Sequence, residues 1–280
     1  ALSLPSSEMT LPGIAPTGIP TWVVWILAFL GGMLAGALWG AIPGLLKSLL
    51  NINEVLACIM TNWIAANLVT WVFDISNLKN MVENTKSGYI YKTTVNGVAT
   101  PGVGLDQLFP GSQVNGGILI AMVLAVAVYV IFSRTTLGYQ LKACGANRYA
   151  ARYAGIQDKR NIVLSMAIAG SLAGAAGALY YLSGNTEFFW STYQTLPAAG
   201  FNGIPVALLA NSHPLGTILS SLFISYLSVG GSAMQPNFSS ETTNIIIAVI
   251  IYLAAFSLLM RTMLAKLSMR RKEKEEEAKQ

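Results

Sequence analysis

Charge is the scarcest property of this sequence. Charged residues make up only 10% of the 280 residues, while hydrophobic residues make up 54% and the mean hydropathy is +0.55. Soluble domains carry roughly 25% charged residues, so this chain has too little charge to cover a water-soluble globule. A disordered chain is also excluded, because disorder requires low hydrophobicity. The class that remains is an integral membrane protein.

Cysteine and histidine are nearly missing as well. Cys58 and Cys144 are the only cysteines and His213 is the only histidine, so we expect neither a disulfide framework nor a metal site. The sequence also lacks the Gly-x-x-x-x-Gly-Lys-Ser/Thr pattern that cradles the phosphates of a nucleotide. We therefore predict no catalytic residue, no metal and no bound cofactor in this chain.

Long uncharged windows predict the membrane spans, because a helix needs about 20 apolar residues to cross a bilayer. One further apolar segment, Ala198–Ala210, is short and contains glycines and a proline, which is typical of a broken helix or half-span. The sequence thus predicts an all-α polytopic helix bundle of about six full spans plus this broken or short segment. The six predicted spans are Trp22–Ile42, Val55–Phe73, Gly117–Phe132, Ile162–Ser183, Leu215–Ser232 and Thr243–Met260.

The distribution of Lys and Arg predicts the orientation. If Lys47, residues 134–160 and the tail 261–280 lie in the cytoplasm, only Lys79, Lys86 and Lys92 of the 17 basic residues lie outside. We therefore expect one multi-pass domain over 1–280 in the cell membrane, an extracellular loop at 74–115 and a cytoplasmic C-terminus. The basic start of the tail favours anionic lipid, and the same clustering argues against nucleic acid as a partner. An outside N-terminus without a signal peptide predicts a further helix upstream.

Small residues form a regular stripe on two of the predicted helices. Glycines recur at strict four-residue spacing in the first helix, and the pattern returns in the fourth. Such stripes let helices approach closely in lipid, so we interpret them as packing surfaces before substrate contacts. The glycines concerned are Gly32, Gly36, Gly40, Gly44, Gly170 and Gly174.

The second predicted helix carries unusual polar residues. Asn51 and Glu54 have the spacing of a capping box, which explains Glu54 better than an ion-coupling role does. Asn62, Trp63 and Asn67 lie deeper, where polar groups mark either a transport path or bonds between helices. At 100° per residue Trp63 and Asn67 share a face. We predict that this face lines a path and that Asn62 bonds a neighbouring helix.

The segment between the third and fourth predicted spans contains a short capped helix. Asn147 is a good N-cap for a helix at Arg148–Ala154, and Gly155 is suited to end it. A helix of this length is unstable alone, so it needs a surface to dock on. It could insert into a groove of a soluble partner through its small alanines, or lie as a basic loop on lipid headgroups.

Several of these segments together resemble the permease subunits of ABC importers. The resemblance is carried in order by Gly36–Lys47, Asn53–Asn62, Leu137–Ile156, Gly200–Ala210 and Pro214–Gly216, and it extends from about Gly32 to Leu259. The most similar branch imports simple sugars and nucleosides and is related to the branched-chain amino acid and ribose permeases. Permeases of that family usually carry additional N-terminal sequence that this chain lacks.

The resemblance implies a function and partners. The chain would form the translocation path for nucleosides, or alternatively for a sugar such as ribose or galactose. A separate cytoplasmic ATPase would use ATP and Mg, and a second permease and an extracellular substrate-binding lipoprotein would complete the importer. The coupling helix to the ATPase would use Gly145, Asn147, Arg148, Ala150, Ala151, Arg152 and Gly155, and the path candidates are Asn62, Trp63, Asn67, Phe201 and Asn202.

Two other classes stay open from the residues alone. An ion-coupled secondary transporter would need carboxylates within the membrane, and Glu54 is the only acid near such a position. A membrane scaffold that transports nothing is the other. Co-purification of an ATPase would separate the importer from both.

Overall fold

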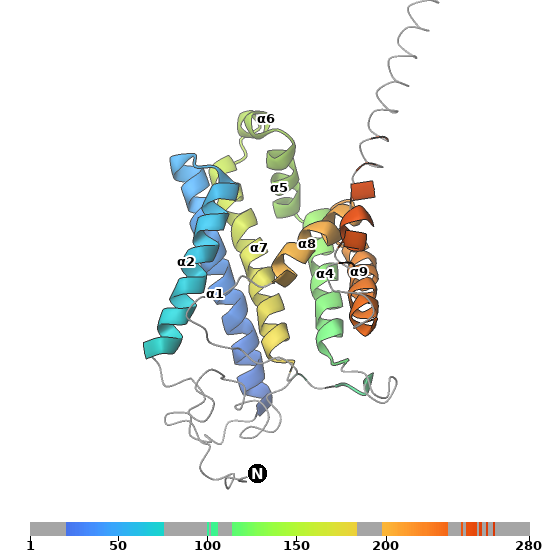
Figure 1. Cartoon of the computed structure of the whole chain (residues 1–280). Helices are drawn as coiled ribbons and strands as arrows, with labels where there is room; N and C mark the ends of the chain where they lie inside the picture. The colour runs from blue at the N-terminus through green and yellow to red at the C-terminus, as the bar shows by residue number, and fades with distance from the viewer. Residues whose placement is uncertain are drawn as a thin grey trace, which may run out of the picture. The chain divides into compact units, whose positions relative to one another are not determined.

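The described part of the chain is helical throughout. The computed structural model describes residues 21–75, 100, 102–105, 114–183, 198–234, 242, 245–250, 252, 253, 256 and 260. No strand occurs among these residues, as the sequence predicts. Two compact units are present, Ala1–Leu196 and Pro197–Gln280, and each is described by itself. The helices, labelled in Figure 1, are α1 Thr21–Leu50, α2 Glu54–Ile75, α4 Gly117–Arg134, α5 Thr136–Ala146, α6 Arg148–Tyr153, α7 Asp158–Tyr181, α8 Ala198–Leu209 and α9 Gly216–Ala233.

Four of the helices are long and apolar enough to cross a membrane: Trp22–Leu50, Glu54–Ile75, Gly117–Arg134 and Asp158–Tyr181. They coincide with the first four predicted spans. Shorter apolar helices follow at Gly200–Leu209 and Gly216–Gly231. Residues 245–250 of the last predicted span are helical, and the remainder of that span lies largely outside the described residues. A polytopic helical membrane protein is therefore confirmed, and six full spans stay a prediction.

The α1–α7 pair forms the centre of the first unit, and its two glycine stripes face each other. A Cβ atom added to Gly36 would collide with the carbonyl oxygen of Gly170 and lie 2.9 Å from the Cα of Gly174. A Cβ on Gly170 would in turn collide with the carbonyl oxygen of Gly36. The same contact continues to Gly40, whose added Cβ would lie 2.7 Å from the carbonyl oxygen of Met166. Close approach of two helix backbones is the packing mode that small residues permit in lipid.

The ends of the stripes contact each other as well. A Cβ on Gly32 would lie 3.1 Å from the Cβ of Ala178, and one on Gly44 would lie 3.0 Å from the Cβ of Met166. Gly174 completes the set, since its added Cβ would collide with the backbone of Gly32. The glycines predicted as a packing surface therefore line one continuous contact along α1 and α7.

The end of α1 differs from the prediction. The helix continues through Pro43 to Leu50, instead of stopping at Ile42. Pro43 removes one backbone hydrogen bond, which a helix with well-packed neighbours tolerates. The chain leaves the helix at Asn51, whose φ of 55° is the left-handed conformation that asparagine adopts more readily than most residues.

The predicted capping box of α2 is wrong by two positions. Asn53 is the residue that caps the helix, because its side-chain oxygen accepts a hydrogen bond from the backbone N–H of Val55 at 2.9 Å. Glu54 instead pairs with Lys47 of α1, with 2.7 Å between the Nζ and Oε2 atoms. The ion pair closes the α1–α2 turn, which is a structural role and not an ion-coupling one.

A three-residue clasp ties the other end of the α1–α7 pair. Thr100 is buried, and its hydroxyl accepts a hydrogen bond from Nε1 of Trp25 in α1 at 3.2 Å. The same hydroxyl donates to the carbonyl oxygen of Leu182, which follows α7, at 3.1 Å. The backbone N–H of Thr100 also donates to that carbonyl, at 2.7 Å. Part of the 74–115 segment is thereby joined to both helices.

The second unit corrects the prediction of a broken helix. α8 is one continuous helix of 12 residues that includes Gly200, Gly203 and Pro205. Its length corresponds to about 18 Å, so the prediction of a short segment is confirmed. The chain then turns at Asn211 and Ser212, both with positive φ, and α9 follows. The hydroxyl of Ser220 in α9 donates to the carbonyl oxygen of Val206 in α8 at 2.9 Å.

Two further predictions fall mainly outside the described residues. Of the 74–115 loop, the structure describes the end of α2, Thr100, residues 102–105 and residues 114–115. The tail 261–280 lies wholly outside them, so its predicted contact with lipid stays a prediction.

Candidate functional site

The α5–α6 segment, residues 135–157, joins the end of α4 to the start of α7 and carries the predicted coupling residues (Figure 1). Residues 136–146, expected as loop, form the 11-residue helix α5. Thr135 is extended and separates α5 from α4; its hydroxyl accepts a hydrogen bond from the N–H of Gly138 at 3.2 Å. A Cβ on Gly138 would lie 2.5 Å from the Cα of Phe132, so the close approach of α5 to the end of α4 requires glycine.

The short helix α6 is capped as the sequence predicts. The Asn147 side-chain oxygen accepts hydrogen bonds from the backbone N–H groups of Tyr149 and Ala150 at 3.0 and 3.1 Å. Gly155 has a φ of 80° at the other end, and its N–H donates to the carbonyl oxygen of Arg152 at 3.0 Å. The helix spans six residues, Arg148–Tyr153, one shorter than predicted. Gly145 lies in the last turn of α5, where an added Cβ would meet no atom within 4 Å.

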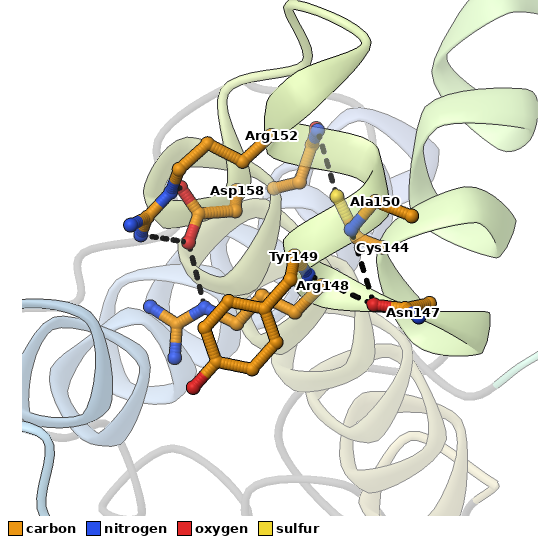
Figure 2. Close-up of polar contacts among 8 residues, drawn as sticks. Cys144, Asn147, Arg148, Tyr149, Ala150, Arg152 and Asp158 are labelled. Atoms are coloured by element: carbon orange, nitrogen blue, oxygen red, sulfur yellow. Dashed lines mark hydrogen bonds and ion pairs between the residues drawn. The ribbon is translucent and has the colours of Figure 1, made fainter.

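A double ion pair holds α6 against the start of α7. Figure 2 shows the two arginines of α6 converging on the carboxylate of Asp158. Arg148 donates through Nε to Oδ2 at 2.6 Å, and Arg152 donates through Nη2 to the same oxygen at 2.7 Å. The side chain of Asp158 is only 8% exposed, and its hydrogen bond and negative charge raise the pKa of the Arg152 guanidinium.

Asp158 is the functional candidate that the sequence reasoning missed. It is the only acidic residue between positions 134 and 160, in a stretch rich in Lys and Arg. Arg148 and Arg152 are four residues apart and so share one face of a helix. One acidic residue shortly after two arginines on the same helix face was the sequence signal that predicts this ion pair.

The exposed face of α6 differs from the one expected. Ala151 is 4% exposed, so it faces this chain and is not accessible to a partner. Ala150 is exposed, and Tyr149 and Tyr153 are 75% and 95% exposed. The surface that α6 offers to other molecules is therefore largely aromatic. Arg152 contributes to it as well, because its side chain is 56% exposed although it pairs with Asp158.

The path candidates on α2 lie on its exposed side. α2 buries Ala57 and Thr61, and leaves Asn62, Trp63 and Asn67 exposed. The side-chain amide of Asn67 donates to the backbone carbonyl oxygen of Trp63, one turn earlier in α2, at 2.8 Å. These two residues share a face as the helical spacing predicts.

The expected bond of Asn62 to a neighbouring helix stays a prediction. Its side chain is exposed and makes no hydrogen bond to another helix in the portion of the chain that the structure describes. The remaining candidates, Phe201 and Asn202, are exposed on α8. They belong to the second unit, so their position relative to α2 is not described.

The apolar helices and their close glycine contacts define a polytopic helical membrane protein, and comparison with known proteins identifies its family. Residues 6–255 match the family described as branched-chain amino acid transport system / permease component. The chain belongs to this family. No solved structure matches it.

Curated relatives include permeases of named transporters. The chain is 34% identical over 249 residues to the nucleoside ABC transporter permease protein NupB of Lactococcus lactis subsp. cremoris (strain MG1363), a match covering 89% of this chain and 68% of the relative. It is 34% identical over 225 residues to the guanosine ABC transporter permease protein NupP of Bacillus subtilis (strain 168), covering 80% and 62%. It is 26% identical over 200 residues to the glucose ABC transporter permease protein TsgB13 of Haloferax volcanii, covering 69% and 50%. The chain thus spans about two thirds of the first two relatives.

Proposed function

We propose that this chain is a permease subunit of an ABC importer and forms the translocation path for nucleosides. The observation that carries the proposal is the 34% identity to both a nucleoside and a guanosine permease over most of this chain. The lower identity of 26% to a glucose permease makes a simple sugar the second candidate. An ion-coupled transporter is disfavoured, because the acids in the described spans, Glu54, Asp74 and Asp158, all lie in the first or last turn of a helix.

The proposed importer contains three kinds of partner. A cytoplasmic ATPase uses ATP and Mg, a second permease completes the path, and an extracellular lipoprotein delivers the substrate. Tyr149, Ala150 and Tyr153 of α6 form the docking surface for the ATPase, since exposed aromatic side chains are frequent anchors at protein interfaces. Because the ATPase is cytoplasmic, its docking on α6 would place α6 and the C-terminus in the cytoplasm, with the permease in the plasma membrane.

The proposed substrate path uses the Trp63–Asn67 face of α2. An indole can stack on a nucleobase, and an amide can bond its edge or a ribose hydroxyl. The hydrogen bond from the Asn67 side chain to the backbone carbonyl of Trp63 supports the assignment, because it directs the Asn67 amide along the turn that carries Trp63. Phe201 and Asn202 are proposed as further contacts from α8.

Reconstitution tests this function. The permease is purified with its ATPase and binding protein, placed in proteoliposomes, and supplied with ATP and radiolabelled guanosine, ribose or glucose in parallel. We expect ATP-dependent uptake of guanosine that exceeds uptake of either sugar. Sugar uptake alone would establish the second candidate, and guanosine uptake that follows an ion gradient without ATP would contradict the importer.

A further inference from the structure

The ion pairs at Asp158 join two helices, α6 and α7, that differ in length and in how they are packed. α6 has only six residues, too few to keep a helix by its own backbone bonds. α7 has 24 residues and contacts α1 along the glycine stripes. Asp158 is the first residue of α7, and its carboxylate accepts hydrogen bonds from both arginines of α6. A six-residue helix is thereby joined by ion pairs to a helix of 24 residues.

Burial of the Asp158 carboxylate makes the ion pairs costly to break from either side. The Asp158 side chain is 8% exposed, while those of Arg148 and Arg152 are 32% and 56% exposed. A largely buried carboxylate that lost its partners would be costly, so the arginines follow Asp158 when α7 moves, and α7 follows when α6 is displaced. Ala151, 4% exposed between the two arginines in sequence, leaves α6 little room to rotate independently.

We propose that Asp158 is a positioning residue that transmits movement between α6 and the α1–α7 pair. The proposal rests on the proposed function, in which α6 docks on the ATPase. Displacement of α6 during ATP hydrolysis then moves α7 and, through the glycine contact, α1. Asp158 touches neither substrate nor nucleotide in this scheme; it acts through Arg148 and Arg152.

The test measures guanosine imported per ATP hydrolysed in the reconstituted complex. Asp158→Asn keeps the size of the side chain and removes its charge, so it should lower this ratio at least about fivefold, the lower end of typical coupling between sites. The amount of bound ATPase should stay unchanged, since Tyr149 and Tyr153 are not altered. Asp158→Glu should restore most of the ratio, and Lys159→Gln, a charge change at the adjacent exposed residue, should leave it unchanged.

A double-mutant comparison separates transmission from general damage. In a background that carries Arg148→Gln and Arg152→Gln, Asp158→Asn should cause little further loss, because groups in one ion-pair network are not additive. An unchanged ratio in Asp158→Asn with ATPase bound would overturn the proposal. Loss of the bound ATPase in that variant would also overturn it, because Asp158 would then only maintain the fold of α6. Absence of guanosine uptake by the wild-type complex would instead refute the proposed function.

Discussion

At the residue scale, the contact between α1 and α7 depends on the missing side chains of a few glycines. Gly36 and Gly170 each lie so close to the other's backbone carbonyl that neither site can hold a methyl group without moving a helix. A displaced helix loses dispersion contacts along its whole length, because interiors are packed at nearly crystalline density. The glycines are therefore required for distance between backbones, not for chain flexibility.

Substitution at Gly170 tests this requirement against a matched site on the same helix. Gly170→Ala should lower the stability of the purified protein by about 1–3 kcal/mol, because the added methyl overpacks the contact. Gly177→Ala should be neutral or stabilising, because nothing lies within 4 Å of that Cβ and alanine is the better helix former. Thermal melting in detergent measures both, and equal melting temperatures would contradict the close approach.

At the scale of single elements, sequence reasoning succeeded where the signal was local. The cap at Asn147 and the end at Gly155 were predictable because each depends on the conformational preference of one residue. The paired arginines were seen, but their partner was not, since Asp158 lies beyond a turn and only the folded chain brings it back. Ala151 was assigned to the wrong face of α6, because a small residue is compatible with either side of a helix.

The remaining errors came from tertiary override of local rules. The first span was predicted to end at Ile42, just before Pro43, yet α1 continues through this proline to Leu50. Gly200 and Pro205 argued for a broken α8, which is continuous. Residues 136–146 are much less apolar than the predicted spans, so α5 was missed, although Thr135 is a recognisable cap.

The exposed tyrosines of α6 provide a test of this element as a docking surface. Tyr149→Ala and Tyr153→Ala should each reduce the affinity for the ATPase more than about tenfold, as expected for aromatic anchors at an interface. Tyr139→Ala in α5 is the control, because that side chain is also 70% exposed and lies outside α6. Co-purification and binding titration give the readout. If all three variants bound the ATPase as tightly as the wild-type protein, the docking surface would not be the tyrosines of α6.

At the scale of the whole molecule, the structure places two regions at opposite ends of α7. Thr100 is bonded to Leu182 after the end of the helix, while Gln157 directly precedes its start. A helix of 24 residues is about 36 Å long, which exceeds the roughly 30 Å hydrocarbon core. Residues 102–105 and residue 157 should therefore lie on opposite sides of the membrane.

Site-directed labelling tests this topology. Val103→Cys and Gln157→Cys are made separately in a background where Cys58 and Cys144 are replaced by alanine; both positions are exposed. We expect an impermeant maleimide to label position 103 on intact cells and position 157 only after the cells are opened, because the positive-inside rule puts residues 134–160 in the cytoplasm. The reverse pattern would invert the protein in the membrane.

The glycine contact between α1 and α7 also has a consequence for the order in which the protein is synthesised and folded. Its two halves are separated by about 130 residues, which corresponds to a delay on the order of ten seconds at 5–20 residues per second of translation. During that interval the stripe of α1 has been made and the stripe of α7 has not. The glycine stripe of α1 therefore leaves the translocon before its partner stripe exists. Pairing of α1 with α7 is slow, because a long stretch of chain separates the two helices. The stripe of α1 therefore faces lipid or another helix until α7 has been made, and the α1–α7 contact forms only after both helices are in the membrane.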